Sequence, residues 1–91
     1  MKVSGKRVVI TGAASGIGKA LAIAFHAADA KSIVCVDQNI TEAKIVAETI
    51  SGYAIEANVG LEKDIINVVD ECNILISGID IFCSNAGITG M

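Results

Sequence analysis

An apolar run, a glycine-rich turn and a helix-forming segment follow one another near the start of this chain. The run begins at Val8 within the expected strand 7–11, the turn contains Gly12, Gly16 and Gly18, and alanine, leucine and isoleucine dominate from position 20. Glycine has no Cβ, so the backbone of such a turn bends tightly and can approach a ligand closely. The first turn of the following helix presents unpaired N–H groups and about half a positive charge of dipole. This order predicts an α/β protein that binds the pyrophosphate of a dinucleotide.

The rest of the chain continues the alternation of strand-like and helix-like segments. A capping box of Asn39 and Glu42 begins the second expected helix, and Gly52 and Gly78 are expected to stop the second and third. Alternating elements imply right-handed crossovers and a parallel sheet. We therefore expect a partial Rossmann-like, doubly wound parallel sheet of strand order 3-2-1-4 with flanking helices. The expected strands are 7–11, 32–36, 53–57 and 79–84, and the expected helices are 16–28, 39–50 and 61–76.

Net charge, the length of the apolar stretches and cysteine spacing argue against several classes of function. The net charge is −3 and the basic residues form no cluster, so we expect no nucleic-acid partner. The sequence has no apolar stretch of the ~18 residues that a membrane helix needs, and no signal-peptide pattern precedes the first strand. The three cysteines have neither zinc-site spacing nor a disulfide framework, and they favour a cytoplasmic protein without a metal.

Asp37 directly follows the second expected strand. A carboxylate at this point accepts hydrogen bonds from the ribose hydroxyls of a dinucleotide and repels a 2′-phosphate. At ~4 Å and an effective dielectric of about 20, one like-charge pair costs on the order of 4 kcal/mol. We therefore expect NAD to be preferred over NADP; the alternative is an ordinary solvated loop aspartate.

Two motifs resemble those of the short-chain dehydrogenase/reductase family. The family pattern T-G-x-x-x-G-I-G is matched by Thr11, Gly12, Gly16, Ile17 and Gly18, and the pattern N-N-A-G by Ser84, Asn85, Ala86 and Gly87, with serine in place of the first asparagine. The resemblance covers essentially the whole chain. It implies an oxidoreductase that transfers a hydride between a nicotinamide and an alcohol or carbonyl carbon. Residues 1–91 would be the amino-terminal NAD-binding part of an incomplete Rossmann-fold domain.

The resemblance also implies which residues contact the cofactor. The glycine motif would line the pyrophosphate and the approach to the nicotinamide ribose. Asn85, Ala86 and Gly87 would pass beside the adenosine ribose and fix the fourth strand. Family members that prefer NADP often carry a basic residue at the position of Ser15, which supports NAD here.

Asn58 and Val59 stand where the family has Asp-Val over the adenine edge. The Asn58 amide can both donate and accept, so it could still contact the adenine amino group. The alternative for Asn58 is a residue that merely forms a turn. The single histidine, His26, is expected on the exposed surface of the first helix.

The catalytic residues that the resemblance would require are not found in this sequence. Family members use a tyrosine with a lysine four residues later, but Tyr53 is the single tyrosine and Ala57 follows it at that distance. We therefore assign no catalytic residue and expect no turnover from this chain alone. Three interpretations stay open: the amino-terminal part of an oxidoreductase, a non-catalytic nucleotide-binding module, or a self-associating fragment. The last would form homo-oligomers through an apolar fourth strand, or would pair with a carboxyl-terminal half.

Overall fold

Four parallel strands form one sheet in the computed structural model, which describes residues 2–14 and 16–85. Their order across the sheet is β3-β2-β1-β4, as predicted. The strand bounds are β1 (Arg7–Thr11), β2 (Ser32–Asp37), β3 (Tyr53–Glu56) and β4 (Ile81–Cys83). β1 pairs with β2 on one side and with β4 on the other, so it is central.

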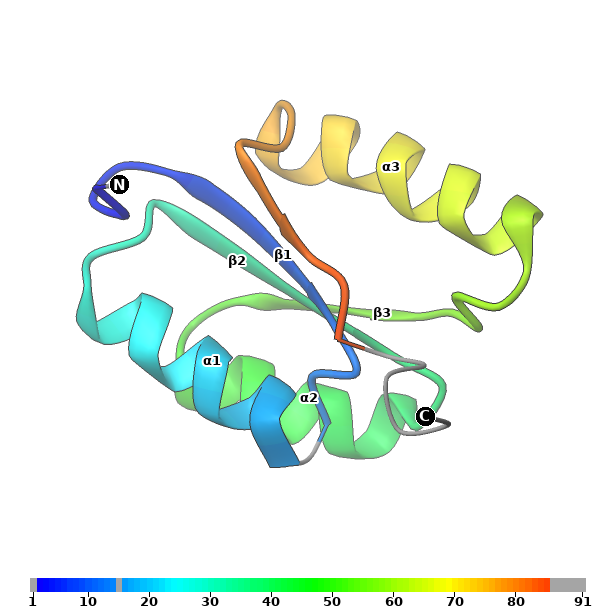
Figure 1. The fold of residues 1–91 in the computed structure, drawn as a ribbon, viewed down its shortest axis with the longest axis horizontal. Coiled ribbons are helices and arrows are strands. Elements are labelled where there is room, and N and C mark those ends of the chain that lie inside the picture. Colours follow the sequence, from blue (N-terminus) through cyan, green and yellow to red (C-terminus); the bar gives the residue numbers. More distant parts are fainter. Residues whose placement is uncertain (1, 15, 86–91) are drawn as a thin grey trace.

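Helices cover both faces of the sheet (Figure 1). α1 (Gly16–Ala27) and α2 (Ile40–Thr49) lie on one face, and α3 (Glu62–Ile76) lies on the other. Successive strand side chains point to opposite faces, so the sheet divides the core into two clusters. The α1/α2 core contains Val8, Ile10, Ile33 and Cys35 with Ala22, Val46, Ala47 and Ile50. The α3 core contains Val9, Val34, Val36 and Ile55 with Val68, Cys72 and Ile76.

Burial on both faces explains the unbroken apolar sequence of the two central strands. Val8, Val9 and Ile10 of β1 are fully buried, and so are Val34 and Val36 of β2. A strand of an antiparallel sheet with one wet face would alternate apolar and polar residues instead. No helix in the described part of the chain has the length and apolar character needed to cross a membrane.

The fourth strand is shorter than predicted. We expected it over residues 79–84, but the ladder begins at Ile81 and ends at Cys83. Asp80 instead lies in the turn before the strand, where its carboxylate pairs with Arg7. The third helix ends at Ile76 as predicted, but its C-cap is Ser77 in the left-handed region (φ 64°), where Gly78 was expected to stop the helix. The contacts of Asp80 with Arg7 therefore accompany the start of β4 at Ile81. The apolar pattern of the sequence does not predict these contacts.

The free thiols Cys35 and Cys72 are buried on opposite faces of the sheet. Cys35 belongs to the α1/α2 core and Cys72 to the α3 core. Burial raises the pKa of the Cys35 thiol to about 11. Burial, with a smaller contribution from the negative charge of Glu71, raises the pKa of Cys72 to about 11 as well. Both thiols are therefore protonated at neutral pH, and they pack as small apolar side chains.

Candidate functional site

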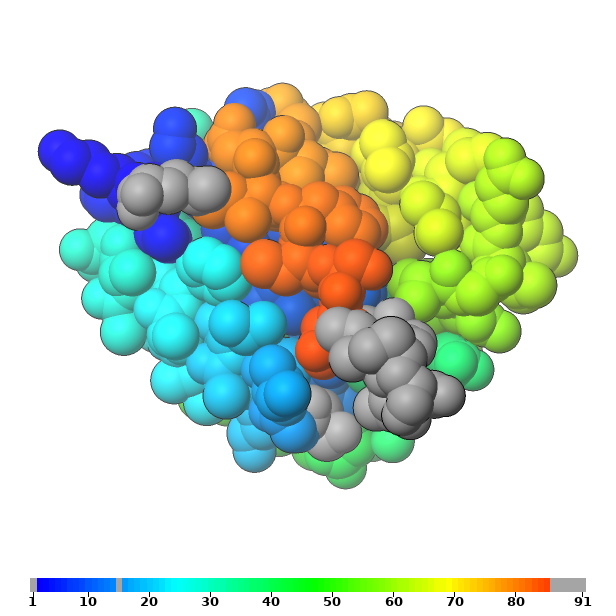
Figure 2. All heavy atoms as spheres, in the orientation of Figure 1, coloured from blue at the N-terminus to red at the C-terminus, as the bar shows by residue number. Residues whose placement is uncertain are grey.

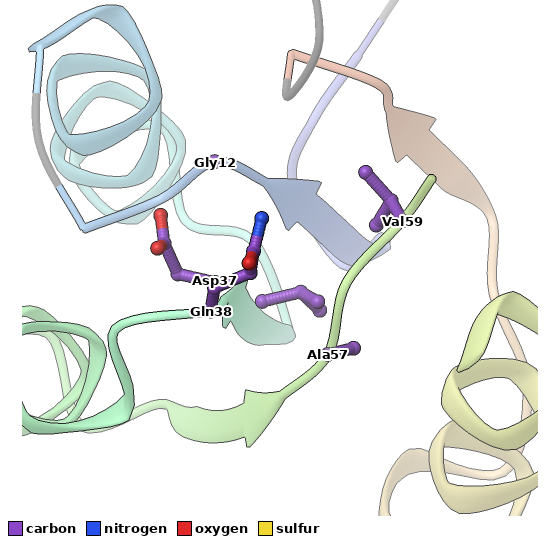
Figure 3. A pocket seen from close by; sticks show the side chains of 6 residues that line it. Gly12, Asp37, Gln38, Ala57 and Val59 are labelled. Carbon is purple, nitrogen blue, oxygen red and sulfur yellow. The ribbon is translucent and has the colours of Figure 1, made fainter. Parts of the chain in front are cut away.

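A small pocket opens beyond the carboxyl ends of β1, β2 and β3 (Figure 3). Its volume is about 50 Å³, and it is lined by Gly12, Val36, Asp37, Gln38, Ala57 and Val59. Open α/β sheets bind their ligands at this edge, near the point where the strand order reverses. Pockets that enclose a whole ligand measure roughly 300–1,000 Å³. This pocket is therefore sized to contact one part of a larger molecule.

The pocket has one apolar side and one polar side. Ala57 and Val59 come from the segment after β3, across the opening from Asp37 and Gln38 at the end of β2 (Figure 3). An apolar wall can pack against the face of a ring. The carboxylate and the amide can form hydrogen bonds with hydroxyl groups. The pair of walls thus suits a ring that carries a polar, hydroxyl-bearing substituent.

Both carboxylate oxygens of Asp37 accept hydrogen bonds from the backbone. Oδ2 accepts from the N–H of Ala14 at 3.1 Å, and Oδ1 accepts from the N–H of Asn39 at 2.9 Å. The first bond fixes the turn after β1, and the second fixes the start of α2. A carboxylate has about four acceptor positions. Asp37 is therefore held in place and can still accept hydrogen bonds from a ligand.

The predicted capping box at the start of α2 is half confirmed. Asn39 Oδ1 accepts from the N–H of Glu42 at 3.2 Å, as a capping side chain does. The N–H of Asn39 donates to Asp37, where a full capping box would have it donate to Glu42. The cap therefore connects α2 to the pocket.

The glycine turn brings the first turn of α1 against the backbone that follows β1. Gly12 (φ 66°) and Gly16 (φ 60°) lie in the left-handed region, which favours glycine. Gly18 is buried, and a Cβ at this residue would overlap the carbonyl oxygen of Gly12. No side chain fits between the helix and the turn, so glycine at position 18 is a packing requirement.

Side chains at the end of β1 connect it to the segment after β4. The Thr11 hydroxyl donates to the carbonyl oxygen of Cys83 at 3.3 Å and accepts from the N–H of Asn85 at 2.8 Å. The side-chain amide of Asn85 donates to the carbonyl oxygen of Gly12 at 3.4 Å. The strand order reverses between β1 and β4, so these bonds hold together the two sides of the expected ligand crevice.

Asn58 takes part in the turn that precedes α3. Its Oδ1 accepts from the N–H of Gly60 at 2.9 Å, and its own N–H donates to Asp64 Oδ2 at 2.7 Å. Asn58 does not line the pocket, although its neighbours Ala57 and Val59 do. These bonds match the turn-forming alternative, and the adenine contact of Asn58 stays a prediction.

The structure brings together some of the predicted cofactor residues. Gly12, Asp37 and Val59 line the pocket, and Thr11 and Asn85 are bonded beside it. The side chain of Ile17 is exposed in the first turn of α1, outside the pocket lining. The predicted residues Ser15, Ala86 and Gly87 lie outside the described part of the chain.

Sequence reasoning missed three residues of the pocket: Val36, Gln38 and Ala57. Each stands at the end of β2 or directly after β2 or β3. The general rule that ligands bind beyond the carboxyl ends of parallel strands could have identified them. Among the described residues, no group of three or more His, Cys, Asp or Glu side chains is placed to hold a metal ion.

Comparison with known proteins agrees with this geometry. The sequence pattern of the short chain dehydrogenase family matches residues 6–91. A 3-oxoacyl-[acyl-carrier-protein] reductase FabG from Aquifex aeolicus is 34% identical over 95 residues, which cover 98% of this chain and 38% of the reductase. A short-chain type dehydrogenase/reductase from Mycobacterium marinum superposes with a TM-score of 0.79 at 31% identity, over 89% of this chain and 34% of that chain. A ribose-5-phosphate isomerase from Brucella melitensis 16M superposes with a TM-score of 0.88 at 28% identity, over 96% of this chain and 34% of that chain.

The chain belongs to the short-chain dehydrogenase family. It spans about a third of the length of the curated relatives that it matches. Proteins of this family bind nicotinamide cofactors, so the pocket at the ends of β1, β2 and β3 is the candidate cofactor site.

Proposed function

We propose that this chain is the cofactor-binding part of an NAD-dependent oxidoreductase and that its pocket holds the adenosine portion of NAD. The observation that carries the proposal is the position of Asp37. Its carboxylate lines the pocket at the carboxyl end of β2, and backbone hydrogen bonds hold both of its oxygens. Ribose hydroxyl groups can donate to such a carboxylate, and the apolar side of the pocket can pack against the base.

NAD is preferred over NADP in this proposal because of charge. A 2′-phosphate beside the Asp37 carboxylate would place two negative groups together, which opposes NADP binding. The family resemblance adds Ser15, which stands where NADP-preferring members often carry a basic residue. A neutral serine at that position offers no compensating positive charge.

The whole protein would transfer a hydride between the nicotinamide and an alcohol or carbonyl carbon. The cofactor supplies the hydride chemistry, and the protein supplies binding and orientation. For residues 1–91 we propose binding without turnover, since the tyrosine–lysine pair of the resembling family is not in this sequence. A cytoplasmic location belongs to the same proposal. A non-catalytic nucleotide-binding module is the alternative.

Calorimetric titration of the purified chain with NAD, and separately with NADP, tests the cofactor proposal. We expect saturable NAD binding and NADP binding weaker by roughly 100-fold. This factor corresponds to about 2.8 kcal/mol, which is less than the ~4 kcal/mol of the unscreened like-charge pair because solvent and salt screen part of the repulsion. Adenosine diphosphate ribose should bind comparably to NAD, because the pocket contacts only the adenosine portion. Equal affinity for NAD and NADP would contradict the assigned role of Asp37. No binding of any of the three would contradict the cofactor site itself.

The edge of β4 favours a second candidate function, which is association with another copy of the chain. Within the described residues β4 pairs with β1 alone, so one side of the strand has no neighbouring strand. Phe82 on this strand is 41% exposed. The orange segment that ends in β4 lies at the surface of the face drawn in Figure 2. An exposed apolar edge strand is a site for pairing with a further strand.

Sedimentation equilibrium over a range of protein concentrations tests self-association. We expect a reversible dimer whose dissociation constant rises at least roughly tenfold in Phe82→Lys, because charge on an edge strand opposes pairing. Ile74→Lys is the matched control, since Ile74 is 82% exposed and belongs to α3, not to the edge strand. A folded monomer at all concentrations would contradict self-association. An equal effect of both variants would mean that the interface does not lie at the edge of β4.

A further inference from the structure

The start of β4 is fixed to the start of β1 by a group of polar contacts around Arg7. The guanidinium Nε and Nη2 donate to the two carboxylate oxygens of Asp80, each at 2.9 Å. The remaining guanidinium nitrogen, Nη1, donates at 2.6 Å to the carbonyl oxygen of Ser77, the C-cap of α3. The Arg7 guanidinium holds the pKa of the Asp80 carboxyl well below its usual range.

The backbone N–H groups of the same two residues also form hydrogen bonds between them. The N–H of Arg7 donates to Asp80 Oδ2 at 2.9 Å, and the N–H of Asp80 donates to the carbonyl oxygen of Arg7 at 2.9 Å. An isolated exposed ion pair contributes little to stability. This pair differs because a two-pronged arginine–carboxylate contact fixes a geometry as well as a charge. It therefore fixes where β4 begins relative to β1.

The other end of β4 is held by the contacts that form the site. The strand has only three residues. The Thr11 hydroxyl donates to the carbonyl oxygen of the last of them, Cys83, and accepts from the N–H of Asn85 just beyond it. Arg7 and Thr11 are the first and last residues of β1. β1 thus holds β4 at both ends through side chains, and only a short ladder lies between these contacts. A slip of one residue in this ladder would turn every side chain of β4 to the opposite face.

We propose that Arg7 and Asp80 are positioning residues for the cofactor site, acting through β4. By fixing the beginning of this short edge strand, they keep Asn85 in place against Thr11 and Gly12 at the carboxyl end. Loss of the pair frees β4 locally, and Asn85 leaves its hydrogen bonds while the rest of the sheet stays folded. The consequence for the cofactor rests on the proposed function, whereas the consequence for Asn85 does not.

Amide hydrogen exchange of Asp80→Asn in the full chain tests the proposal. An asparagine keeps the shape of the side chain but turns an N–H₂ group toward the donors of Arg7. We expect exchange at the Asn85 N–H to accelerate on the order of tenfold, as local opening of β4 requires. The N–H of Ala57, which donates to the carbonyl oxygen of Asp37 at 3.2 Å, should change less than about twofold because β4 opens without the rest of the sheet.

Asp29→Asn is the matched control for the loss of one carboxylate. Asp29 lies before β2, at the same end of the sheet, and its side chain has no hydrogen bond among the described residues. Asparagine tolerates the left-handed backbone of this residue (φ 66°). We expect Asp29→Asn to leave exchange at Asn85 unchanged. An unchanged Asn85 N–H in Asp80→Asn overturns the proposal. Equal acceleration at Asn85 and Ala57 also overturns it, because that would be a general loss of stability.

Arg7→Lys provides a milder variant in case Asp80→Asn unfolds the chain. Lysine keeps the positive charge but loses the two-pronged contact. Exchange at Asn85 should accelerate by several-fold, again without a matching change at Ala57. Acceleration at neither residue, or equally at both, would count against the proposal.

NAD titration of the same variants separates the two proposals. Affinity that falls several-fold in Asp80→Asn and not in Asp29→Asn supports positioning of the site. If the unmodified chain binds no NAD, the proposed function fails, and the exchange rates still decide the role of the pair.

Discussion

Replacing Gly18 by alanine is expected to lower the free energy of unfolding by about 3 kcal/mol, near the upper end for overpacking. The added Cβ would overlap the carbonyl oxygen of Gly12 and reach 3.0 Å from the Cα of Ala13. Both contacts are with backbone, which cannot rotate away as a flexible side chain would. Relief requires α1 to move off the turn, and that movement would also displace the helix start from the position expected for the pyrophosphate. Urea denaturation measures the stability, and NAD titration measures the effect on the site.

Gly5→Ala separates this close approach from the ordinary cost of a left-handed residue. Gly5 also has a positive φ (77°), but a Cβ there meets nothing within 4 Å. We expect Gly5→Ala to cost about 1 kcal/mol, which is the penalty of the backbone conformation alone. Similar losses in the two variants would show that contact between α1 and the turn is not what requires glycine at position 18.

Replacing Asp37 by alanine is expected to reduce the preference for NAD over NADP by roughly 100-fold, because the charge that opposes a 2′-phosphate is removed. The variant also loses the hydrogen bonds from the N–H groups of Ala14 and Asn39. That loss loosens the turn and the start of α2, so both cofactors bind more weakly. The ratio of the two affinities cancels this common loss and isolates the effect of charge.

Two further variants sharpen the measurement at Asp37. Asp37→Asn removes the charge at nearly constant shape and should change the ratio as much as alanine does. Glu56→Gln removes an exposed carboxylate from the residue of β3 that pairs with Asp37 in the ladder, outside the pocket lining. It should leave the ratio within about twofold, since exposed charges are well screened. A ratio unaffected by either change at Asp37 would mean that another group selects the cofactor.

The order of the strands could be predicted because the pattern that determines it is local. Continuous apolar runs such as Val8–Ile10 and Ile33–Val36 are typical of strands covered on both faces, and helical segments between them imply parallel pairing. The glycine motif that includes Gly12 and Gly18 located the turn, because a side chain at Gly18 would overlap the backbone of Gly12. Asp37 could be placed because it directly follows the predicted strand 32–36, and in the structure it is the last residue of β2.

Other features depend on partners that are distant in sequence. The pairing of Arg7 with Asp80 joins residues far apart along the chain. Because the apolar pattern does not show this pairing, the predicted start of the fourth strand at Ile79 was wrong, and the strand begins at Ile81. The bonds of Asn58 with Gly60 and Asp64 are local but compete with a ligand contact, and composition does not decide between them. Gln38 could have been identified as the residue directly after β2, but its sharing of one pocket with Ala57 and Val59 depends on how the ends of β2 and β3 meet.

The two buried thiols provide chemical reporters of how the fold comes apart. Cys35 and Cys72 lie on opposite faces of the sheet, one beneath α1 and α2 and the other beneath α3. A thiol-specific reagent reacts with the thiolate, and burial with a high pKa suppresses that form in the native state. The modification rate of each cysteine therefore records how often its own helical layer opens. A difference between the two rates would reveal which layer opens more often, and both reporters are cysteines that the sequence already contains.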